Sequence, residues 1–440
     1  MERFATADAR FPIAMSAAIP KNALARNTAW MILGRGLGLI IQAAYFIEIA
    51  RSLGVSNYGA FVGVVALVGI VWPFASVGGS NLLIKNVSRD KSLFPTYWGR
   101  ALVTTAAFGS LLILAVLMIS RFVLPPEIPL LLVLLVAASD ILALNILTIA
   151  SQAFQAFERL DWTAGLGVLM LSSRLAGAIT LIAIVPHPTA LQWGYSYFCS
   201  SAFVACMSSL IAGKKLGWPQ LNWRRSPEEM REGFWFSTAQ SAQTIYNDID
   251  KTMLARLGTL DATGIYGAAY RLIDVSFVPV SALLYSAYPN FFRAGASGIS
   301  SSLQYAKPLI LRAIGYSTIV CAGILLCAGW VPYVLGPDYT RIVEALRWLA
   351  VLPVLKAMHY FLADTLTGAG YQAVRTCIQA GVGAFNILIN LWLIPAYSWR
   401  GAAWASIASD ALLLAGVAGA VLLLSRSRGK VLVTATANGD

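Results

Sequence analysis

A polar segment interrupts an otherwise apolar chain at residues 236–254, which read FSTAQSAQTIYNDIDKTML. Asp248, Asp250 and Lys251 would each cost about 2.5–3.5 kcal/mol at the centre of a lipid-facing helix. The apolar residues of the segment return only about 0.3–0.6 kcal/mol each, so charges deep in the membrane would need protein or water around them. The segment also carries polar residues at helical spacing on one face: Gln240, Thr244, Asn247 and Lys251.

Two interpretations of this polar face are open. It could be a hydrogen-bonded seam between helices, or the wall of a water-filled substrate path. Similar groups in other apolar windows favour the path, although any one charge could equally belong to a structural ion pair. These groups are Arg35 with Gln42, Asp140, Arg174, Arg271 with Asp274, Lys356 with Tyr360 and Asp364, Gln379, Asn386 and Asn390, and Asp410.

The distribution of these residues predicts a polar cavity between two halves of the chain. Arginine and lysine in its wall favour an anionic substrate, with phosphate groups as the leading candidate. Arg35 ranks first because its helix offers no acidic partner at pairing distance, whereas Lys356 is set aside because Asp364 lies two turns away on its own helix face. The predicted cations are Arg35, Arg174, Lys251 and Arg271, and the predicted polar wall is Gln42, Gln240, Thr244 and Asn247.

Three carboxylates are candidates for ion coupling, since each lies near an intramembrane base. They are Asp250, Asp274 and Asp364. Transport by alternating access needs a group whose protonation or ion occupancy biases two states. Each carboxylate could instead be a static partner of Lys251, Arg271 or Lys356.

Composition defines the class of protein that must position these groups. Of the 440 residues, 58% are hydrophobic and only 12% are charged, and the mean hydropathy is +0.69. Several nearly uncharged windows are long enough to cross a bilayer core of about 30 Å as a helix. The chain is therefore predicted to be a polytopic membrane protein. Its five cysteines lie in or beside apolar windows and are interpreted as small buried hydrophobic residues.

The apolar windows predict an all-α protein of about twelve transmembrane helices. The expected helices are 28–50, 58–84, 97–119, 128–150, 163–185, 191–213, 233–255, 264–291, 308–329, 342–368, 371–395 and 401–424. No loop between them is long enough for a catalytic domain outside the membrane. The expected domains are a tail (1–27), a six-helix bundle (28–213), a basic linker (214–232), a second six-helix bundle (233–424) and a second tail (425–440).

The basic residues predict the orientation. With the N-terminus in the cytoplasm, 20 of the 32 Lys and Arg residues fall in cytoplasmic segments and 5 in outer loops. This positive-inside bias places both termini in the cytoplasm. It also accounts for the net charge of +12, so no nucleic-acid partner is expected. Residues 1–27 do not have the pattern of a cleavable signal peptide.

The two predicted bundles resemble each other in sequence. Trp30 precedes IARSLGVSNYGAF (49–61), and Trp235 precedes LARLGTLDATGIYGAA (254–269). In both segments an Ala-Arg pair is followed by Leu-Gly and then Tyr-Gly. Six predicted helices, an even number, separate the copies, so they share one orientation. This is a parallel repeat of the kind found in transporters.

Three features that could suggest an enzyme do not fit their context. DID at 248–250 mimics a metal site of glycosyltransferases, but it lies inside a predicted span. GRGLG at 34–38 follows no strand, and its glycines more readily allow close helix packing. His187 and His359 have no partners at metal-ligand spacing. We find no nucleophile–base pair and no Walker motif, and predict no catalytic residue, cofactor or metal.

Longer motifs carry a family resemblance over residues 24–424. The first half contains GRGLGLIIQAAYFIEIARSLGVSNYGAFVGVVALVGIVWPFASVGGSNLLIKNVSR, and the second contains NDIDKTMLARLGTLDATGIYGAAYRL and YSAYPNFF. The closing helices contain LGPDYTRIVEALRWLAVLPVLKAMHYFLADTLTGAG and NILINLWLIPAYSWRGAAWASIASD. In order and spacing, these segments resemble the Wzx-type polysaccharide (O-antigen) flippases of the multidrug/oligosaccharidyl-lipid/polysaccharide exporter superfamily.

The resemblance implies a V-shaped pair of six-helix bundles in the inner membrane. Such proteins move an isoprenoid-diphosphate-linked oligosaccharide, such as an undecaprenyl diphosphate precursor of lipopolysaccharide or exopolysaccharide, to the outer leaflet. The expected partners are this substrate, membrane lipids, H+ or Na+ as coupling ion, and the polysaccharide polymerase machinery. An ion-coupled drug exporter of the same superfamily is the first alternative. A membrane-embedded glycosyltransferase or polymerase is the second, and it would require a large outer loop.

Overall fold

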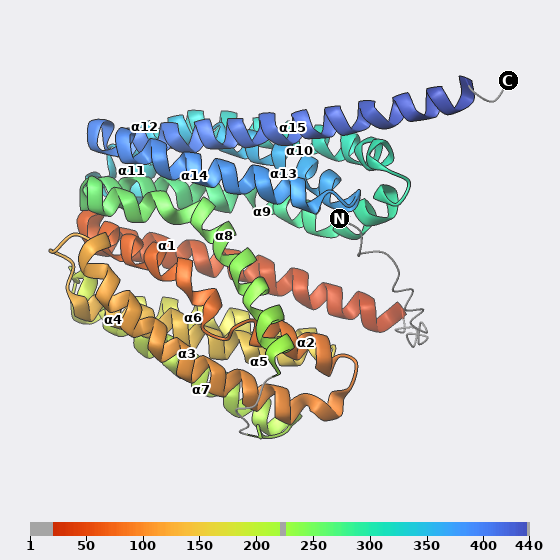
Figure 1. Ribbon diagram of the computed structural model, residues 1–440. Coiled ribbons are helices and arrows are strands. Elements are labelled where there is room, and N and C mark those ends of the chain that lie inside the picture. The colour runs from red at the N-terminus through yellow and green to blue at the C-terminus, as the bar shows by residue number, and fades with distance from the viewer. Residues whose placement is uncertain (1–20, 221–225, 438–440) are drawn as a thin grey trace.

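The computed structural model describes residues 21–220 and 226–437, and these residues contain helices and no β-strand (Figure 1). Most of the predicted N-terminal tail, residues 221–225 of the predicted linker and residues 438–440 lie outside the described residues. The N-half contains α1 (Lys21–Val71), η1 (Trp72–Phe74), α2 (Gly79–Val87), η2 (Lys91–Leu93), α3 (Phe94–Val123), α4 (Leu130–Ala137), η3 (Ala138–Ala143), α5 (Leu144–Ala156), α6 (Leu160–Ile184) and α7 (Ala190–Leu216). The C-half contains α8 (Pro227–Leu257), α9 (Leu260–Gly295), α10 (Ile299–Cys327), η4 (Ala328–Trp330), α11 (Val331–Leu335), η5 (Pro337–Tyr339), α12 (Ile342–Leu349), α13 (Leu352–Gly368), α14 (Gln372–Tyr397) and α15 (Trp399–Ala437).

The described residues confirm the all-helical membrane fold with two repeated halves. Ten of their helical segments are long and apolar enough to cross a membrane. One of them, Leu33–Phe74, contains two of the predicted helices, because Gly54 (φ 68°) joins two segments of α1 that run in opposite directions. The polar helix α8 is not among the ten, although it has the length of the others. When α1 is counted as two spans and α8 is added, the described residues contain twelve spans, which correspond to the twelve predicted helices.

The predicted helix 58–84 is not continuous. Its first part ends at Val71, where Pro73 begins a short 3-10 turn. Val77 (φ 44°) and Gly78 (φ 64°) then adopt left-handed backbone conformations, which an α-helix does not allow. The chain resumes as α2 at Gly79.

Other helix boundaries differ from prediction for reasons of local chemistry. Helix α8 begins at Pro227, before the predicted residue 233, because Ser226 and Glu229 form a capping box. Helix α10 begins at Ile299 and includes Pro308, where the sequence predicted a start. The predicted helix 342–368 is divided into α12 and α13, and Pro353 lies at the start of the second part.

Glycines bring the two halves into close contact. A Cβ atom at Gly59 would lie 1.8 Å from the carbonyl oxygen of Leu260, and one at Gly264 would lie 2.1 Å from that of Val55. A Cβ atom at Gly267 would lie 2.8 Å from the Val62 side chain. Gly59 and Gly267 belong to the repeated Tyr-Gly motifs, so the duplicated segments form the interface between the halves.

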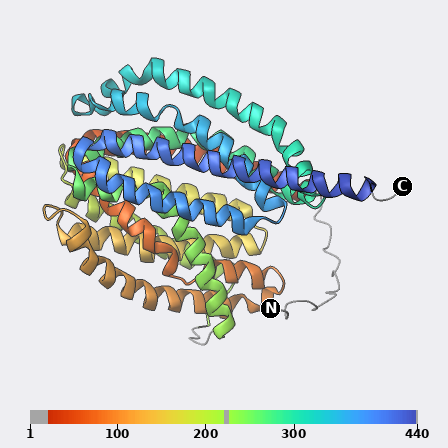
Figure 2. The same cartoon turned by 45° about the horizontal axis from the view of Figure 1, so that its top comes forward.

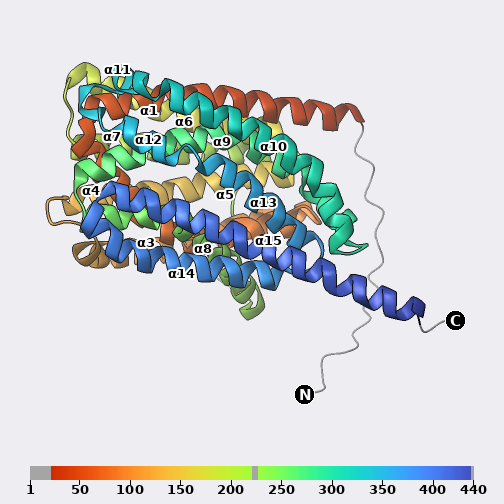
Figure 3. The same ribbon diagram turned by 90° about the horizontal axis from the view of Figure 1, so that it is seen from above.

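The halves meet most closely where α1 bends, which we call the Gly54 end. There the Tyr339 hydroxyl donates to the Ala50 carbonyl oxygen (3.0 Å), and Arg256 donates to the Leu124 carbonyl oxygen (3.3 Å). At the opposite end, which we call the termini end, α1 begins and α15 extends away from the bundle (Figures 1 and 3). Figure 1 shows the two groups of helices diverging from the Gly54 end toward the termini end, and Figure 2 shows α15 leaving the bundle at the termini end.

Helix α8 connects the halves by belonging to both. Its first turns lie on the N-half, where Glu232 binds Lys85 (2.6 Å) and Ser237 donates to the Pro73 carbonyl oxygen (2.8 Å). Its later turns lie within the C-half, where the Tyr246 hydroxyl donates to Asp410. Figure 1 shows this green helix crossing from the lower to the upper group.

Candidate functional site

A cavity of about 420 Å³ lies between the two halves, which we call the central cavity. Helices α1, α6 and α7 with η1 and η3 line one side, and α8 and α9 line the other. The N-half side carries an aromatic wall, which consists of Tyr45, Phe46, Tyr58, Phe61, Trp72 and Tyr197. The C-half side carries mainly polar groups: Thr244, Asp248, Lys251, Arg271 and Asp274.

The N-half contributes one buried ion pair to the cavity. Arg174 of α6 lies 3.3 Å from Asp140, and its guanidinium stacks 4.0 Å from the centre of the Tyr197 ring. The Tyr197 hydroxyl donates to the same carboxylate (2.8 Å). Asp140 lies in the π-helical turn η3, a backbone irregularity that frequently marks functional positions. Arg174 is therefore in the cavity as predicted, but its charge is compensated.

Only part of the predicted polar face of α8 reaches the cavity. Lys251 and Thr244 line it, whereas Gln240 and Asn247 do not. The Lys251 ammonium binds the Asp248 carboxylate and the Asn247 carbonyl oxygen (3.1 Å). It also lies 4.2 Å from the centre of the Tyr270 ring. Lys251 thus has a carboxylate partner one turn earlier on its own helix.

Arg271 is the exception among the cavity cations. Asp274, its expected partner on α9, instead lies 3.7 Å from Lys356, which also donates to the Tyr270 hydroxyl (3.0 Å). No other described residue forms a hydrogen bond or an ion pair with Arg271. Since Arg174 and Lys251 are paired, Arg271 supplies the cavity's uncompensated positive charge.

Arg35 and Gln42 lie in a different pocket, of about 390 Å³, formed by α1, α6 and Val278 of α9. Arg35 is exposed, and its guanidinium lies 5.5 Å from the centre of the Tyr285 ring. In the same pocket a Cβ atom at Gly34 would lie 2.7 Å from that of Ala164. The glycines of the GRGLG motif thus allow close approach of α1 and α6.

The three ion-coupling candidates have different surroundings. Asp364 is paired with Arg375 (2.9 Å), and Asp274 is paired with Lys356. Asp250 is buried and receives hydrogen bonds from the Tyr266 and Ser406 hydroxyls, with no ion-pair partner among the described residues. A buried carboxylate held only by neutral donors carries the least compensated charge of the three.

The sequence missed the partner of His359. In the structure its Nε2 atom lies 3.4 Å from Asp410 of α15, in the interior of the C-half. Nearby, Asn386 donates to the Ser409 hydroxyl (2.9 Å). These residues can be identified in the sequence as charged or polar groups, but their proximity depends on how α13, α14 and α15 pack. Among the described residues, no group of three or more His, Cys, Asp or Glu side chains could hold a metal ion.

The aromatic wall was also missed. Its residues come from three separate elements, α1, η1 and α7, and single aromatic residues in apolar helices usually indicate packing. The only local sequence signal is the pair Tyr58 and Phe61, spaced three residues apart on α1.

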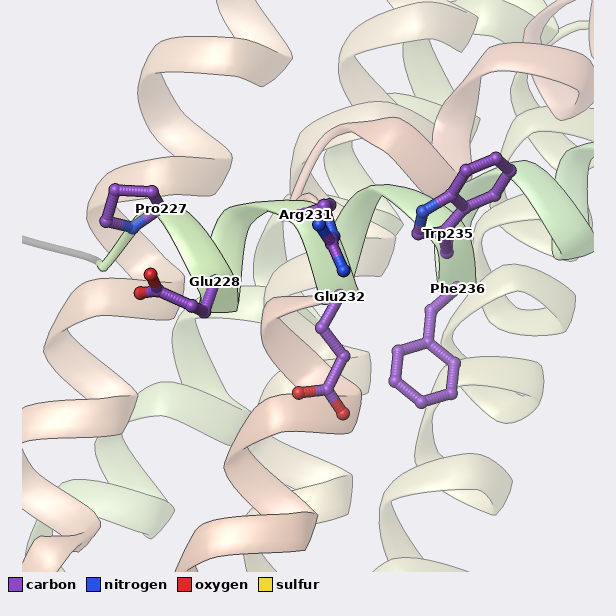
Figure 4. A pocket seen from close by; sticks show the side chains of 6 residues that line it. All are labelled: Pro227, Glu228, Arg231, Glu232, Trp235 and Phe236. Atoms are coloured by element: carbon purple, nitrogen blue, oxygen red, sulfur yellow. The ribbon is translucent and has the colours of Figure 1, made fainter. Parts of the chain in front are cut away.

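A further pocket of about 730 Å³ lies along the first turns of α8. Figure 4 shows Arg231 and Glu232 beside Trp235 and Phe236, on the part of α8 that contacts the N-half. Its residues do not line the central cavity. Aromatic and charged side chains in this combination are typical of a membrane–water interface.

Comparison with solved structures defines the class of fold. An inward-facing multidrug resistance MATE transporter of the MOP superfamily matches with a TM-score of 0.71 and 14% identity, over 90% of this chain and 99% of that one. An outward-facing MATE transporter matches with a TM-score of 0.62 and 14% identity, over 91% and 96%. A MOP-superfamily transporter from Pyrococcus furiosus, described as having a binding pocket of reverse polarity, matches with a TM-score of 0.58 and 15% identity, over 92% and 97%. The fold is that of the MOP-superfamily transporters.

Sequence comparison then gives the family. The family described as polysaccharide biosynthesis proteins matches residues 24–294. The chain belongs to this family, as the resemblance to Wzx-type flippases predicts. A search of curated proteins finds no match.

Proposed function

We propose that the protein flips an isoprenoid-diphosphate-linked oligosaccharide from the cytoplasmic to the outer leaflet of the inner membrane, for polysaccharide biosynthesis. The family is one of polysaccharide biosynthesis, and the fold is shared with transporters that occur in inward- and outward-facing forms. The protein acts by alternating access and does not catalyse a reaction. Both termini lie in the cytoplasm, as the positive-inside bias predicts.

The observation that carries this proposal is the uncompensated charge of Arg271 in a cavity between the halves. A guanidinium that no carboxylate neutralises can form charge-assisted, bidentate hydrogen bonds with a phosphate group. Its location between the halves suits a site that must open to each side in turn. Lys251, whose Asp248 partner is partly exposed, supplies a second positive group on the same wall.

Deletion of the gene tests the proposal. Surface or secreted polysaccharide should be lost, with drug sensitivity unchanged. In the complemented strain, Arg271→Ala should lower export by about 10- to 100-fold, the value of hydrogen bonds to a charged group, and Arg271→Lys should restore part of it. Arg121→Ala is the matched control, because Arg121 is exposed at the end of α3 and does not line the cavity. Normal polysaccharide in the deletion strain would contradict the proposal.

A drug exporter is the second candidate, favoured by the three carboxylates that line the cavity, Asp140, Asp248 and Asp274. Such groups can attract a cationic drug. Each of these carboxylates is already paired with a cation of the protein, however, so the unpaired Arg271 would repel a cationic drug. A deletion strain that becomes sensitive to cationic drugs and keeps its polysaccharide would establish this candidate.

A further inference from the structure

We propose that the aromatic wall of the central cavity is the saccharide subsite, which binds the face of a sugar ring and hydrogen-bonds its hydroxyl groups through Tyr45 and Tyr58. This inference rests on the proposed function and assigns the part of the substrate that Arg271 does not contact. It identifies the N-half as the part of the protein that distinguishes a glycan from other anionic lipids.

The aromatic wall is rigid because its rings support one another. Phe61 and Tyr197 meet edge to face at 5.2 Å between ring centres, and Phe46 and Tyr58 do so at 6.0 Å. Trp193, fully buried behind the wall, contacts Tyr45 (5.7 Å), Phe61 (6.1 Å) and Tyr197 (5.8 Å). Rings fixed before the substrate arrives lose little entropy on binding.

Two phenol groups on this wall have no partner among the described residues. The hydroxyls of Tyr197 and Tyr266 donate to Asp140 and Asp250, and that of Tyr246 donates to Asp410. Tyr45 and Tyr58 line the cavity and make no hydrogen bond to another described residue. The Tyr58 side chain is buried and that of Tyr45 is half-buried. Tyrosine hydroxyls in such positions usually find a partner, and a ligand in the cavity would supply one.

The position of Arg271 gives the ligand a direction. Arg271 of α9 lines the same cavity as Tyr45 and Tyr58 of α1, so the aromatic wall and the anion-binding group belong to opposite halves around one cavity. A sugar presents C–H groups of positive partial charge on its face, which suits the negative face of an aromatic ring, and hydroxyl groups at its edge. A glycosyl phosphate carries these groups beside its anionic end. A flat cationic drug would also stack on the rings, but it would be repelled by Arg271 and would not need the phenol hydroxyls.

The double variant Tyr45→Phe/Tyr58→Phe tests the subsite, because it removes two hydroxyl groups and keeps both rings. In the complemented deletion strain we expect polysaccharide export to fall about tenfold, the loss of two modest hydrogen bonds. Tyr333→Phe is the control, since Tyr333 is 84% exposed and does not line the central cavity. The amount of protein in the membrane is measured for each variant.

The outcomes separate this inference from the proposed function. If deletion abolishes export and the double variant exports at the wild-type rate, the saccharide subsite is wrong and the flippase stands. If deletion leaves export intact, both are wrong. Should the double variant accumulate poorly, the two single variants carry the test, with a loss of about threefold expected for each. Wild-type export from both singles would overturn the subsite.

Discussion

The two walls of the central cavity hold their polar groups in different ways. On the N-half side, rings packed edge to face surround a single ion pair, Arg174 with Asp140. On the C-half side there are two ion pairs, Lys251 with Asp248 and Lys356 with Asp274, and both ammonium groups lie over the Tyr270 ring. The N-half wall is therefore mostly uncharged surface, and the C-half wall holds paired charges beside one cation, Arg271, that has no counter-ion among the described residues.

This difference suggests a division of tasks between two duplicated halves. The repeated Tyr-Gly segments keep the same place in each half, at the contact between them. The residues that face the cavity have diverged, toward ring surfaces on one side and toward charge on the other. Duplication thus accounts for the shared interface between the halves, while the residues proposed to bind the substrate are those that differ between the two halves.

The largest expected effect comes from breaking the N-half ion pair. Arg174→Ala leaves Asp140 buried without its cation, and removing one partner of a buried pair costs about 3–5 kcal/mol. We expect a lower melting temperature of the purified protein and less protein in the membrane. The double variant Asp140→Asn/Arg174→Gln, which removes both charges, should recover most of the loss. A stable Arg174→Ala protein that fails to export would instead assign Arg174 to the substrate, as the sequence predicts.

The second-largest expected effect is at Asp250, one of three carboxylates of the C-half that are candidates for ion coupling. Asp250→Asn should weaken the dependence of transport on an imposed H+ or Na+ gradient by about fivefold or more, the usual range of coupling between sites. Its carboxylate accepts hydrogen bonds only from neutral groups, which are the Tyr266 and Ser406 hydroxyls and the Lys251 backbone N–H, so its occupancy by a proton or ion is free to change. Transport into inverted membrane vesicles under each gradient is the measurement.

The paired carboxylates serve as controls for this series. Asp274→Asn and Asp364→Asn leave Lys356 and Arg375 without their partners, so we expect lower stability and unchanged gradient dependence. Full gradient dependence in Asp250→Asn, with protein at normal levels, would remove Asp250 as the coupling site. Loss of gradient dependence at Asp274 or Asp364 would show that an ion pair can itself be the switch.

Hydropathy was enough to predict the apolar helices, because crossing a bilayer demands long apolar windows. It did not locate the breaks at residues 72–78 and near residue 350, where proline and left-handed backbone conformations interrupt apolar sequence. The polar helix α8 was predicted as the span 233–255, with polar residues at helical spacing. Its attachment to the N-half was not predictable, since the contacts of Glu232 and Ser237 depend on tertiary packing.

The candidate site was predicted less well than the fold, because its contacts also depend on tertiary packing. The sequence named the cations but could not tell which were paired, because Asp140 and Arg174 lie on different helices and meet only after folding. Arg271 and Asp274 have the spacing of a helical ion pair, yet Asp274 turns to Lys356. The aromatic wall left almost no local signal.

The smallest expected effect is at Arg35, which the sequence ranked first. Arg35 is exposed in a second pocket, away from the cavity, and its visible interaction is with the Tyr285 ring. Such an exposed contact is worth about 0.5–1 kcal/mol, so Arg35→Ala should lower polysaccharide export by less than about fivefold, well below the effect of Arg271→Ala. Export and membrane protein levels are compared in the same complemented strain, with Arg35→Lys keeping the charge. Complete loss of export in Arg35→Ala, rescued by Arg35→Lys, would place a second charged step on α1 before the central cavity. The contrast between an aromatic N-half and a charged C-half would then have to be abandoned.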